Sequence, residues 1–222
     1  MPVEHAIDSP IAGRDVRVLG LVGTGHFFSH FLGIALPPLF PVMQADLSVG
    51  YAALGTLLAV ANVATMICQL PVGVMVDRFG ARRLLALGLG IMSGAIAAIG
   101  IVPGYGAVLA MMLLVGVGNS VFHPADYAVL AARISPQRLG RAFSLHTFAG
   151  HVGWTVSPLT LAFLTALWSW RLALIVAGTC GLVAAFWIIL YGRILDEPAE
   201  HHRPTEPARP RAAATPPVRL VT

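Results

Sequence analysis

Residues 73–83 separate two long apolar stretches and read Gly73-Val-Met-Val-Asp77-Arg78-Phe-Gly80-Ala-Arg82-Arg83. Gly80 supplies the permissive backbone that a turn requires, and Gly73 lets a neighbouring helix approach closely. Asp77 is a lone carboxylate beside three arginines, where it can pair with an arginine or with the positive end of a helix. The segment is therefore expected to close one apolar helix and to open the next.

The amino-acid composition of the whole chain indicates that it lies in a lipid membrane. Hydrophobic residues make up 57% and charged residues 11% of the sequence, and the mean hydropathy is +0.79. A soluble domain has about a quarter of its residues charged. All 14 basic residues are arginine, which indicates a compositional bias and does not favour nucleic-acid binding. Cys68 and Cys180 lie in separate apolar runs, so we expect no disulfide framework and no metal finger.

Six stretches reach the length of about 20 mainly apolar residues that a membrane-spanning helix needs. We expect these spans near residues 18–42, 50–76, 83–102, 105–132, 140–166 and 171–192. The predicted fold is an all-α membrane protein with one six-helix bundle over residues 18–195. Residues 1–17 are read as a polar cytoplasmic segment before a true span, not as a cleaved signal peptide. Residues 196–222 are rich in Pro, Ala and Arg and are expected to form a disordered tail.

The arginines are distributed unevenly between the connections. The N-terminal segment, the second and fourth connections and the start of the tail hold Arg14, Arg17, Arg78, Arg82, Arg83, Arg133, Arg138, Arg141 and Arg193. The first, third and fifth connections hold only Arg171. Because basic loops stay on the cytoplasmic side, we expect both termini to be cytoplasmic. Trp168 and Trp170 then lie at the outer interface, which suits amphipathic rings.

The spacing of residues 73–83 resembles the signature between the second and third helices of the major facilitator superfamily. Two further stretches support the resemblance, namely 116–124 in the fourth span and the antiporter-like Gly153-Trp-Thr-Val-Ser157-Pro158 in the fifth. Ser157 stands where that pattern usually has Gly, and Met111-Met112 stand where many members carry an Arg.

The resemblance implies a fold of two six-helix bundles, of which this chain carries the first. It implies a secondary transporter that couples efflux to protons, and a carboxylate at the position of Asp77 that latches the cytoplasmic side against the second bundle. The second bundle is then a partner, either a separate chain or a second copy. Residues 196–222 resemble the linker between the bundles. The expected location is a bacterial-type cytoplasmic membrane.

Within that superfamily, the sequence resembles the fosmidomycin-resistance type of exporters. The resemblance rests on Gly25-His26-Phe-Phe-Ser-His30, on Leu36-Pro37-Pro38-Leu-Phe-Pro41, on Phe122-His123-Pro124 and on Gly140-Arg141-Ala-Phe-Ser144. It implies a small amphipathic or anionic substrate.

Ionisable residues inside predicted spans mark an ion or substrate path, because they are costly at membrane depth. Asp126 is the only carboxylate well inside a predicted span and is our candidate proton-binding group, with His123 and His30 as possible partners. The expected path comprises His26, His30, Asn119, His123, Asp126 and His151. Pro124 is expected to loosen the fourth helix.

Further side chains on the fifth span and in the glycine-rich runs have plainer interpretations. Thr147, His151 and Thr155 share one face of the predicted fifth helix, and His146 is read as interfacial. Glycines at 88, 90, 94, 116 and 118 indicate tight helix packing.

Two other functions compete with transport by a complete assembly. Gly118-Asn119-Ser120 is similar to the Gly-x-Ser stretch of intramembrane serine proteases, for which His151 would have to serve as the base. A truncated or partner-dependent subunit without independent transport is the other alternative. His26 and His30 are two metal-type ligands without a third, so neither a metal nor a cofactor is expected.

Overall fold

The computed structural model of the chain describes residues 13–196, and the predicted tail after Asp196 lies outside that range. Within it the chain is helical and has no strand. The helices are α1 (Gly13–Gly33), the 3₁₀ turn η2 (Pro37–Leu39), α2 (Phe40–Leu47), α3 (Tyr51–Phe79), α4 (Ala81–Ile99), α5 (Gly104–Asn119), α6 (Phe122–Arg133), α7 (Pro136–Leu167), α8 (Trp170–Tyr191) and the 3₁₀ turn η3 (Gly192–Leu195).

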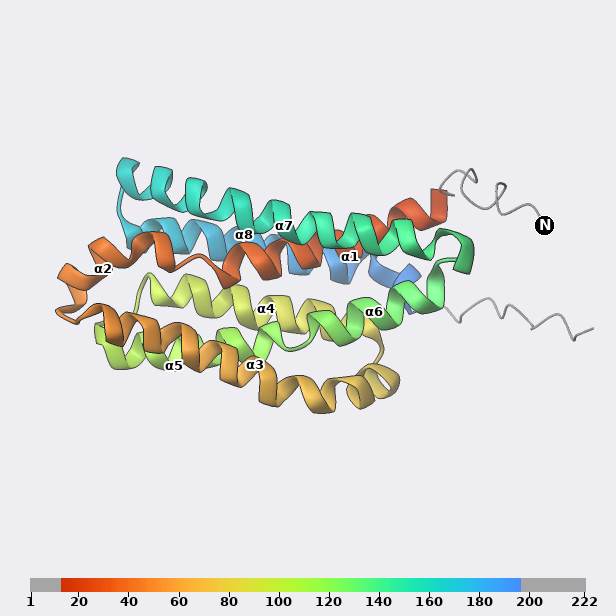
Figure 1. The fold of residues 1–222 in the computed structure, drawn as a ribbon, viewed down its shortest axis with the longest axis horizontal. Coiled ribbons are helices and arrows are strands. Elements are labelled where there is room, and N and C mark those ends of the chain that lie inside the picture. The colour runs from red at the N-terminus through yellow and green to blue at the C-terminus, as the bar shows by residue number, and fades with distance from the viewer. Residues whose placement is uncertain (1–12, 197–222) are drawn as a thin grey trace, which may run out of the picture.

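These helices run along one elongated bundle (Figure 1), and they make six passes because α1 with α2, and α5 with α6, each form one pass. Gly13 and Asp196 lie at the same end, together with the α3–α4 and α6–α7 connections. We call this the terminal end and the other the opposite end. Five passes are long and apolar enough to span a membrane, at 13–47, 51–79, 81–99, 104–133 and 170–195. The sixth, α7, is 32 residues long and carries more polar side chains. The prediction of one all-α bundle of membrane-spanning helices is confirmed, and five of its six passes are long and apolar enough to span a membrane.

Two of the spans expected to be continuous are broken at prolines. The first was predicted over 18–42, but α1 ends at Gly33, four residues before Pro37, which has no N–H to donate to the Gly33 carbonyl. The fourth was predicted over 105–132, but residues 120 and 121 separate α5 from α6. Pro124 removes the hydrogen bond that the Ser120 carbonyl would accept, so the expected loosening occurs one turn before the proline.

The segment 73–83 is more helical than predicted. α3 continues to Phe79 and α4 begins at Ala81, so Gly80 alone lies outside both helices. Its φ of 83° lies in the region that favours glycine, and its N–H donates to the Val76 carbonyl at 2.9 Å. A single residue therefore reverses the chain direction at the terminal end.

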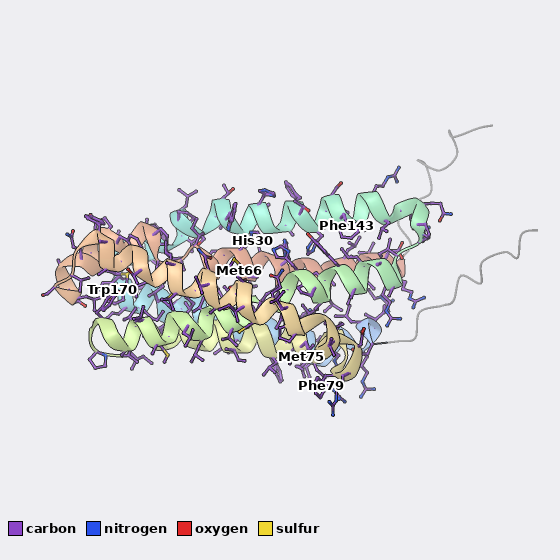
Figure 2. All side chains as sticks on the ribbon, turned by 60° about the horizontal axis from the view of Figure 1, so that its bottom comes forward. His30, Met66, Met75, Phe79, Phe143 and Trp170 are labelled. Atoms are coloured by element: carbon purple, nitrogen blue, oxygen red, sulfur yellow. The ribbon has the colours of Figure 1, made fainter. Side chains whose placement is uncertain are left out.

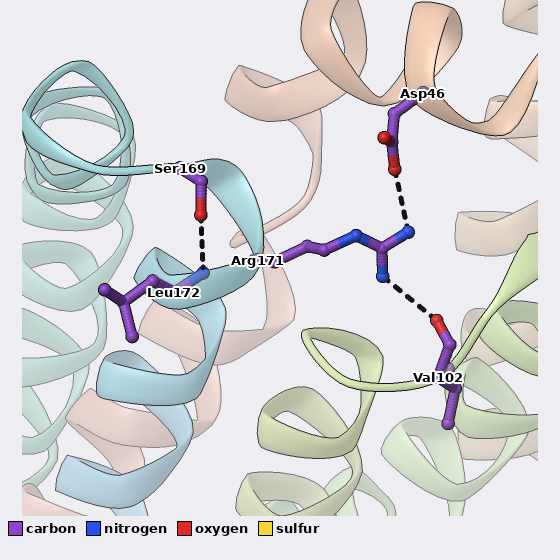
Figure 3. Close-up of polar contacts among 5 residues, drawn as sticks. All are labelled: Asp46, Val102, Ser169, Arg171 and Leu172. Atoms are coloured by element: carbon purple, nitrogen blue, oxygen red, sulfur yellow. Dashed lines mark hydrogen bonds and ion pairs between the residues drawn. The ribbon is translucent and has the colours of Figure 1, made fainter.

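Arg171 holds three connections together at the opposite end (Figure 3). Its guanidinium donates to the Asp46 carboxylate at 2.7 Å and to the Val102 carbonyl at 3.0 Å. It also lies 4.3 Å from the centre of the Trp170 ring. Ser169 caps α8 by accepting the N–H of Leu172 at 3.2 Å. The one arginine of the three connections at this end thus has a structural role.

The interior is packed through glycine contacts, above all around α4. A Cβ on Gly88 would lie 2.7 Å from the Gly118 carbonyl oxygen, and one on Gly178 would lie 2.6 Å from the Ala97 nitrogen. The expected tight packing is confirmed at Gly88, Gly116 and Gly118, whereas within residues 13–196 nothing lies within 4 Å of a Cβ on Gly90 or Gly94.

Large apolar side chains cover much of the outer surface. Met66 and Leu70 on α3 are 71% and 84% exposed. In water such a surface would be unfavourable, so it fits contact with lipid or with another apolar bundle.

Substitutions in α4 test this packing. We expect Gly88→Val to destabilise the bundle by about 1–3 kcal/mol, because the new side chain must push against the α5 backbone. Gly90→Val, two residues along the same helix, meets open space and serves as the matched control. Thermal unfolding of both variants in detergent measures the difference. Equal melting temperatures would contradict the packing of α4 on α5.

Candidate functional site

The buried carboxylate of Asp126, on α6, lies between two histidines from other helices. Its Oδ2 atom is 3.3 Å from Nδ1 of His26 on α1 and 3.7 Å from Nε2 of His146 on α7. Asp126 is 0%, His146 2% and His26 3% exposed. We call these three residues the buried triad.

The triad atoms are close, but they are not aligned as hydrogen bonds. Among the residues that the structure describes, no hydrogen-bond partner of good geometry meets either carboxylate oxygen of Asp126, Nδ1 of His26 or either ring nitrogen of His146. The His26 and His146 rings lie 3.7 Å apart, centre to centre, at an interplanar angle of 30°. Because unpaired polar groups are costly away from water, this cluster is unusual for a bundle interior.

A cavity of about 350 Å³ adjoins the triad on the side of the opposite end. His30 of α1 and His123 of α6 line it, and their rings lie 4.4 Å and 5.5 Å from the His26 ring. Asn119 and Trp154 also line it, and the Trp154 ring is 5.0 Å from that of His30. Figure 2 shows His30 about midway along the bundle. A continuous series of imidazoles thus leads from the cavity to Asp126.

Close packing of α7 on α1 brings His146 to the triad. A Cβ on Gly150 would lie 2.7 Å from the His26 ring, and Gly153 packs directly on the Phe27 carbonyl. Ser157 donates its hydroxyl to the Phe31 carbonyl at 2.6 Å. That carbonyl belongs to the last turn of α1, where the helix has no N–H to offer it. Gly153 and Ser157 therefore fix the contact between the two helices, and Pro158 follows them within α7.

His146 was predicted to be interfacial, and that prediction is wrong. The buried face of α7 carries His146, Gly150, Gly153 and Ser157 at helical spacing, whereas Thr147, His151 and Thr155 are exposed. The glycines were the signal, because they mark the face that can approach another helix closely. His151 bonds to the Thr147 carbonyl of its own helix at 2.9 Å and does not line the cavity.

The other predicted residues divide between the triad and the cavity. His26 and Asp126 are in the triad, while His30, Asn119 and His123 line the cavity. The nearest imidazoles to Asp126 are those of His26 and His146, in place of the expected His123 and His30.

The signature residues lie at the terminal end. The backbone N–H of Arg82 donates to the Asp196 carboxylate at 3.2 Å, and its guanidinium donates to the Ile189 carbonyl. Asp77, Gly80 and Asp196 line a second hollow of about 240 Å³. Arg78 lies over the Phe79 ring, and Arg83 is exposed. Gly73 is exposed, and among the described residues nothing lies within 4 Å of its Cβ position.

The donor atoms of the triad lie within 4.8 Å of one another, a spacing that a divalent metal could bridge. Charge argues for a proton instead. A carboxylate and two neutral imidazoles have no net charge once they bind one proton. A divalent ion would instead leave a net positive charge in a site closed to water.

Serine-protease chemistry has no support here. The hydroxyl of Ser120 is buried and donates to the Val117 carbonyl at 2.7 Å. His151 is exposed on α7 and bonds within its own helix. The pair does not form a nucleophile and base.

Known proteins resemble this chain in both sequence and fold. It is 27% identical to the fosmidomycin resistance protein of Escherichia coli over 166 residues, which cover 74% of this chain and 41% of that protein. It is 29% identical to a probable L-galactonate transporter of Escherichia coli over 150 residues, which cover 67% of this chain and 33% of that protein.

The fold matches an inward-facing bacterial homologue of the human lysosomal transporter Spinster with a TM-score of 0.70 and 16% identity, over 85% of this chain and 45% of that chain. The chain spans less than half the length of these relatives. The profile of the Major Facilitator Superfamily matches residues 22–221. The chain is a multi-pass membrane protein that belongs to the Major Facilitator Superfamily of non-enzymatic transporters.

Proposed function

We propose that the chain is the first bundle of a proton-coupled secondary transporter that exports a small amphipathic or anionic compound by alternating access. The observation that carries the proposal is the carboxylate of Asp126, enclosed between His26 and His146 beside a cavity. The membrane is a bacterial-type cytoplasmic membrane, and both termini lie on its cytoplasmic side.

The net charge of the buried triad couples proton binding to the conformation of the bundle. With one proton the buried triad is neutral and tolerates a closed, dry environment, whereas without it a net negative charge is left inside the membrane. The deprotonated triad therefore favours a conformation in which water or a positive group reaches it. His30 and His123 pass protons between the cavity and His26, and Asn119 binds substrate in the cavity.

Alternating access requires a second bundle, supplied by a separate chain or by a second copy of this one. Two observations support a second bundle. The outer surface of α3 is apolar and exposed, and the chain covers less than half the length of each relative. Asp77 and the arginines around it would meet that bundle at the terminal end, where Gly73 leaves room for a close contact. The name of the fosmidomycin resistance protein supports efflux of a foreign compound.

Replacement of Asp126 by Asn tests the coupling. Asn has a similar shape but cannot carry the proton, so movement of substrate driven by a pH gradient should be lost. Exchange of substrate between the two sides moves no net proton and should persist. Both are measured in proteoliposomes of the two-bundle assembly. Asp46→Asn, an exposed carboxylate at the opposite end, is the control and should retain both activities. Gradient-driven transport by Asp126→Asn would refute the coupling.

Cysteine labelling tests the orientation. Gln137 and Ile101 are exposed residues at the terminal and opposite ends. With the native cysteines Cys68 and Cys180 replaced by Ala, an impermeant maleimide applied to intact spheroplasts should label Ile101→Cys. Gln137→Cys should be labelled only after the membrane is permeabilised. The reverse pattern would place the termini outside.

A further inference from the structure

A hollow on the outside of the bundle lies where the first pass begins and the last pass ends. α1 and η3 contact each other at the terminal end (Figure 1), and the hollow between α1 and the end of α8 has a volume of about 420 Å³. It is lined by Arg17, Gly20, Leu21, Trp187, Tyr191 and Ile194. Both helices belong to stretches that are long and apolar enough to span a membrane, so the hollow lies near a membrane–water interface.

The hollow carries a positive charge that its own wall does not neutralise. Among the described residues that line it, Arg17 is the only charged one. Arg17 is exposed, and over residues 13–196 its guanidinium forms no hydrogen bond or ion pair. Asp15, two residues earlier on α1, is buried and accepts a hydrogen bond from Nε of Arg138 at 2.7 Å. The hollow therefore favours an anionic group and offers a cationic group no carboxylate.

The remainder of the hollow is aromatic and aliphatic. Trp187 and Tyr191, one turn apart on α8, are 51% and 57% exposed, and their rings lie 4.1 Å apart, centre to centre. Such rings prefer the level of the lipid head groups. Gly20 leaves space on the α1 side, because within the described chain nothing lies within 4 Å of its Cβ position. Val183, one turn from Trp187 toward the opposite end, is 64% exposed and extends the apolar surface along α8.

We infer that this hollow binds one anionic phospholipid, with the phosphate against the Arg17 guanidinium and an acyl chain along Trp187 and Val183. A guanidinium binds phosphate through charge-assisted hydrogen bonds, and a basic pocket between the ends of spanning helices suits a charged head group. A zwitterionic lipid fits less well, because its ammonium group finds no carboxylate in the wall. The hollow shares no residue with the cavity or the buried triad, so this site is separate from the proposed transport path.

Native mass spectrometry of the full chain tests the inference, with the chain released from nanodiscs of equal parts phosphatidylglycerol and phosphatidylcholine. We expect one phosphatidylglycerol to be retained about fivefold more often than phosphatidylcholine, as the attraction of one arginine to an anionic lipid predicts. Dissolved glycerol 3-phosphate has the phosphate without the acyl chains and should not displace the lipid. Equal retention of the two lipids, or displacement by glycerol 3-phosphate, would overturn the inference.

Two variants locate the site, one by charge and one by shape. Arg17→Gln should abolish the preference for phosphatidylglycerol, whereas Arg83→Gln, at an exposed arginine of the same end outside the hollow, should keep it. Gly20→Leu keeps the charge but fills the hollow, so it should lower the retention of lipid. Gly55→Leu, at an exposed glycine that also has open space around its Cβ position, is the matched control and should not.

Thermal unfolding in the same nanodiscs checks that each variant is folded. A preference that survives Arg17→Gln, or lipid retention that survives Gly20→Leu, would place the lipid elsewhere and contradict the inference.

Discussion

The structure depends on one constraint, which is that a carboxylate enclosed in a membrane bundle needs compensation. Asp126 lies at 0% exposure, and the groups that meet it are two imidazoles from α1 and α7. The three groups come from three helices: Asp126 from α6, His26 from α1 and His146 from α7. The helices must therefore approach closely at one level, and the packing of α1, α6 and α7 serves that requirement.

Small residues make this approach possible. Gly150 lies against His26, and Gly153 and Ser157 lie against the last turns of α1. On the other side, Gly25 packs against Phe122 of α6 at ordinary contact distance. The helix breaks contribute as well. The breaks after Gly33 and Asn119 lie beside the cavity, so residues of α1, α5 and α6 line it together. The same glycines and prolines thus position both the triad and the cavity.

The sequence was sufficient for the fold and for part of the site. Hydropathy located six passes, and the spacing of residues 73–83 identified the family. Both signals can be read from short continuous stretches of the sequence. The partners of Asp126 could not be predicted in this way, since the rotation of α7 relative to α1 is a tertiary property. The sequence placed Thr147, His151 and Thr155 on one polar face of α7, yet the buried face is the one that carries His146 and Gly150. The break after Gly33 was not predicted, although Pro37 removes the hydrogen bond that the Gly33 carbonyl would accept.

Infrared difference spectroscopy of the chain in bilayers tests the central claim most directly, with Asp126→Asn used to assign the carboxyl signal. If the triad shares one proton, His26→Gln and His146→Gln should each shift the signal of Asp126, while His151→Gln should leave it unchanged. A signal of Asp126 that is the same in all three histidine variants would contradict the shared proton, and with it the coupling that we propose.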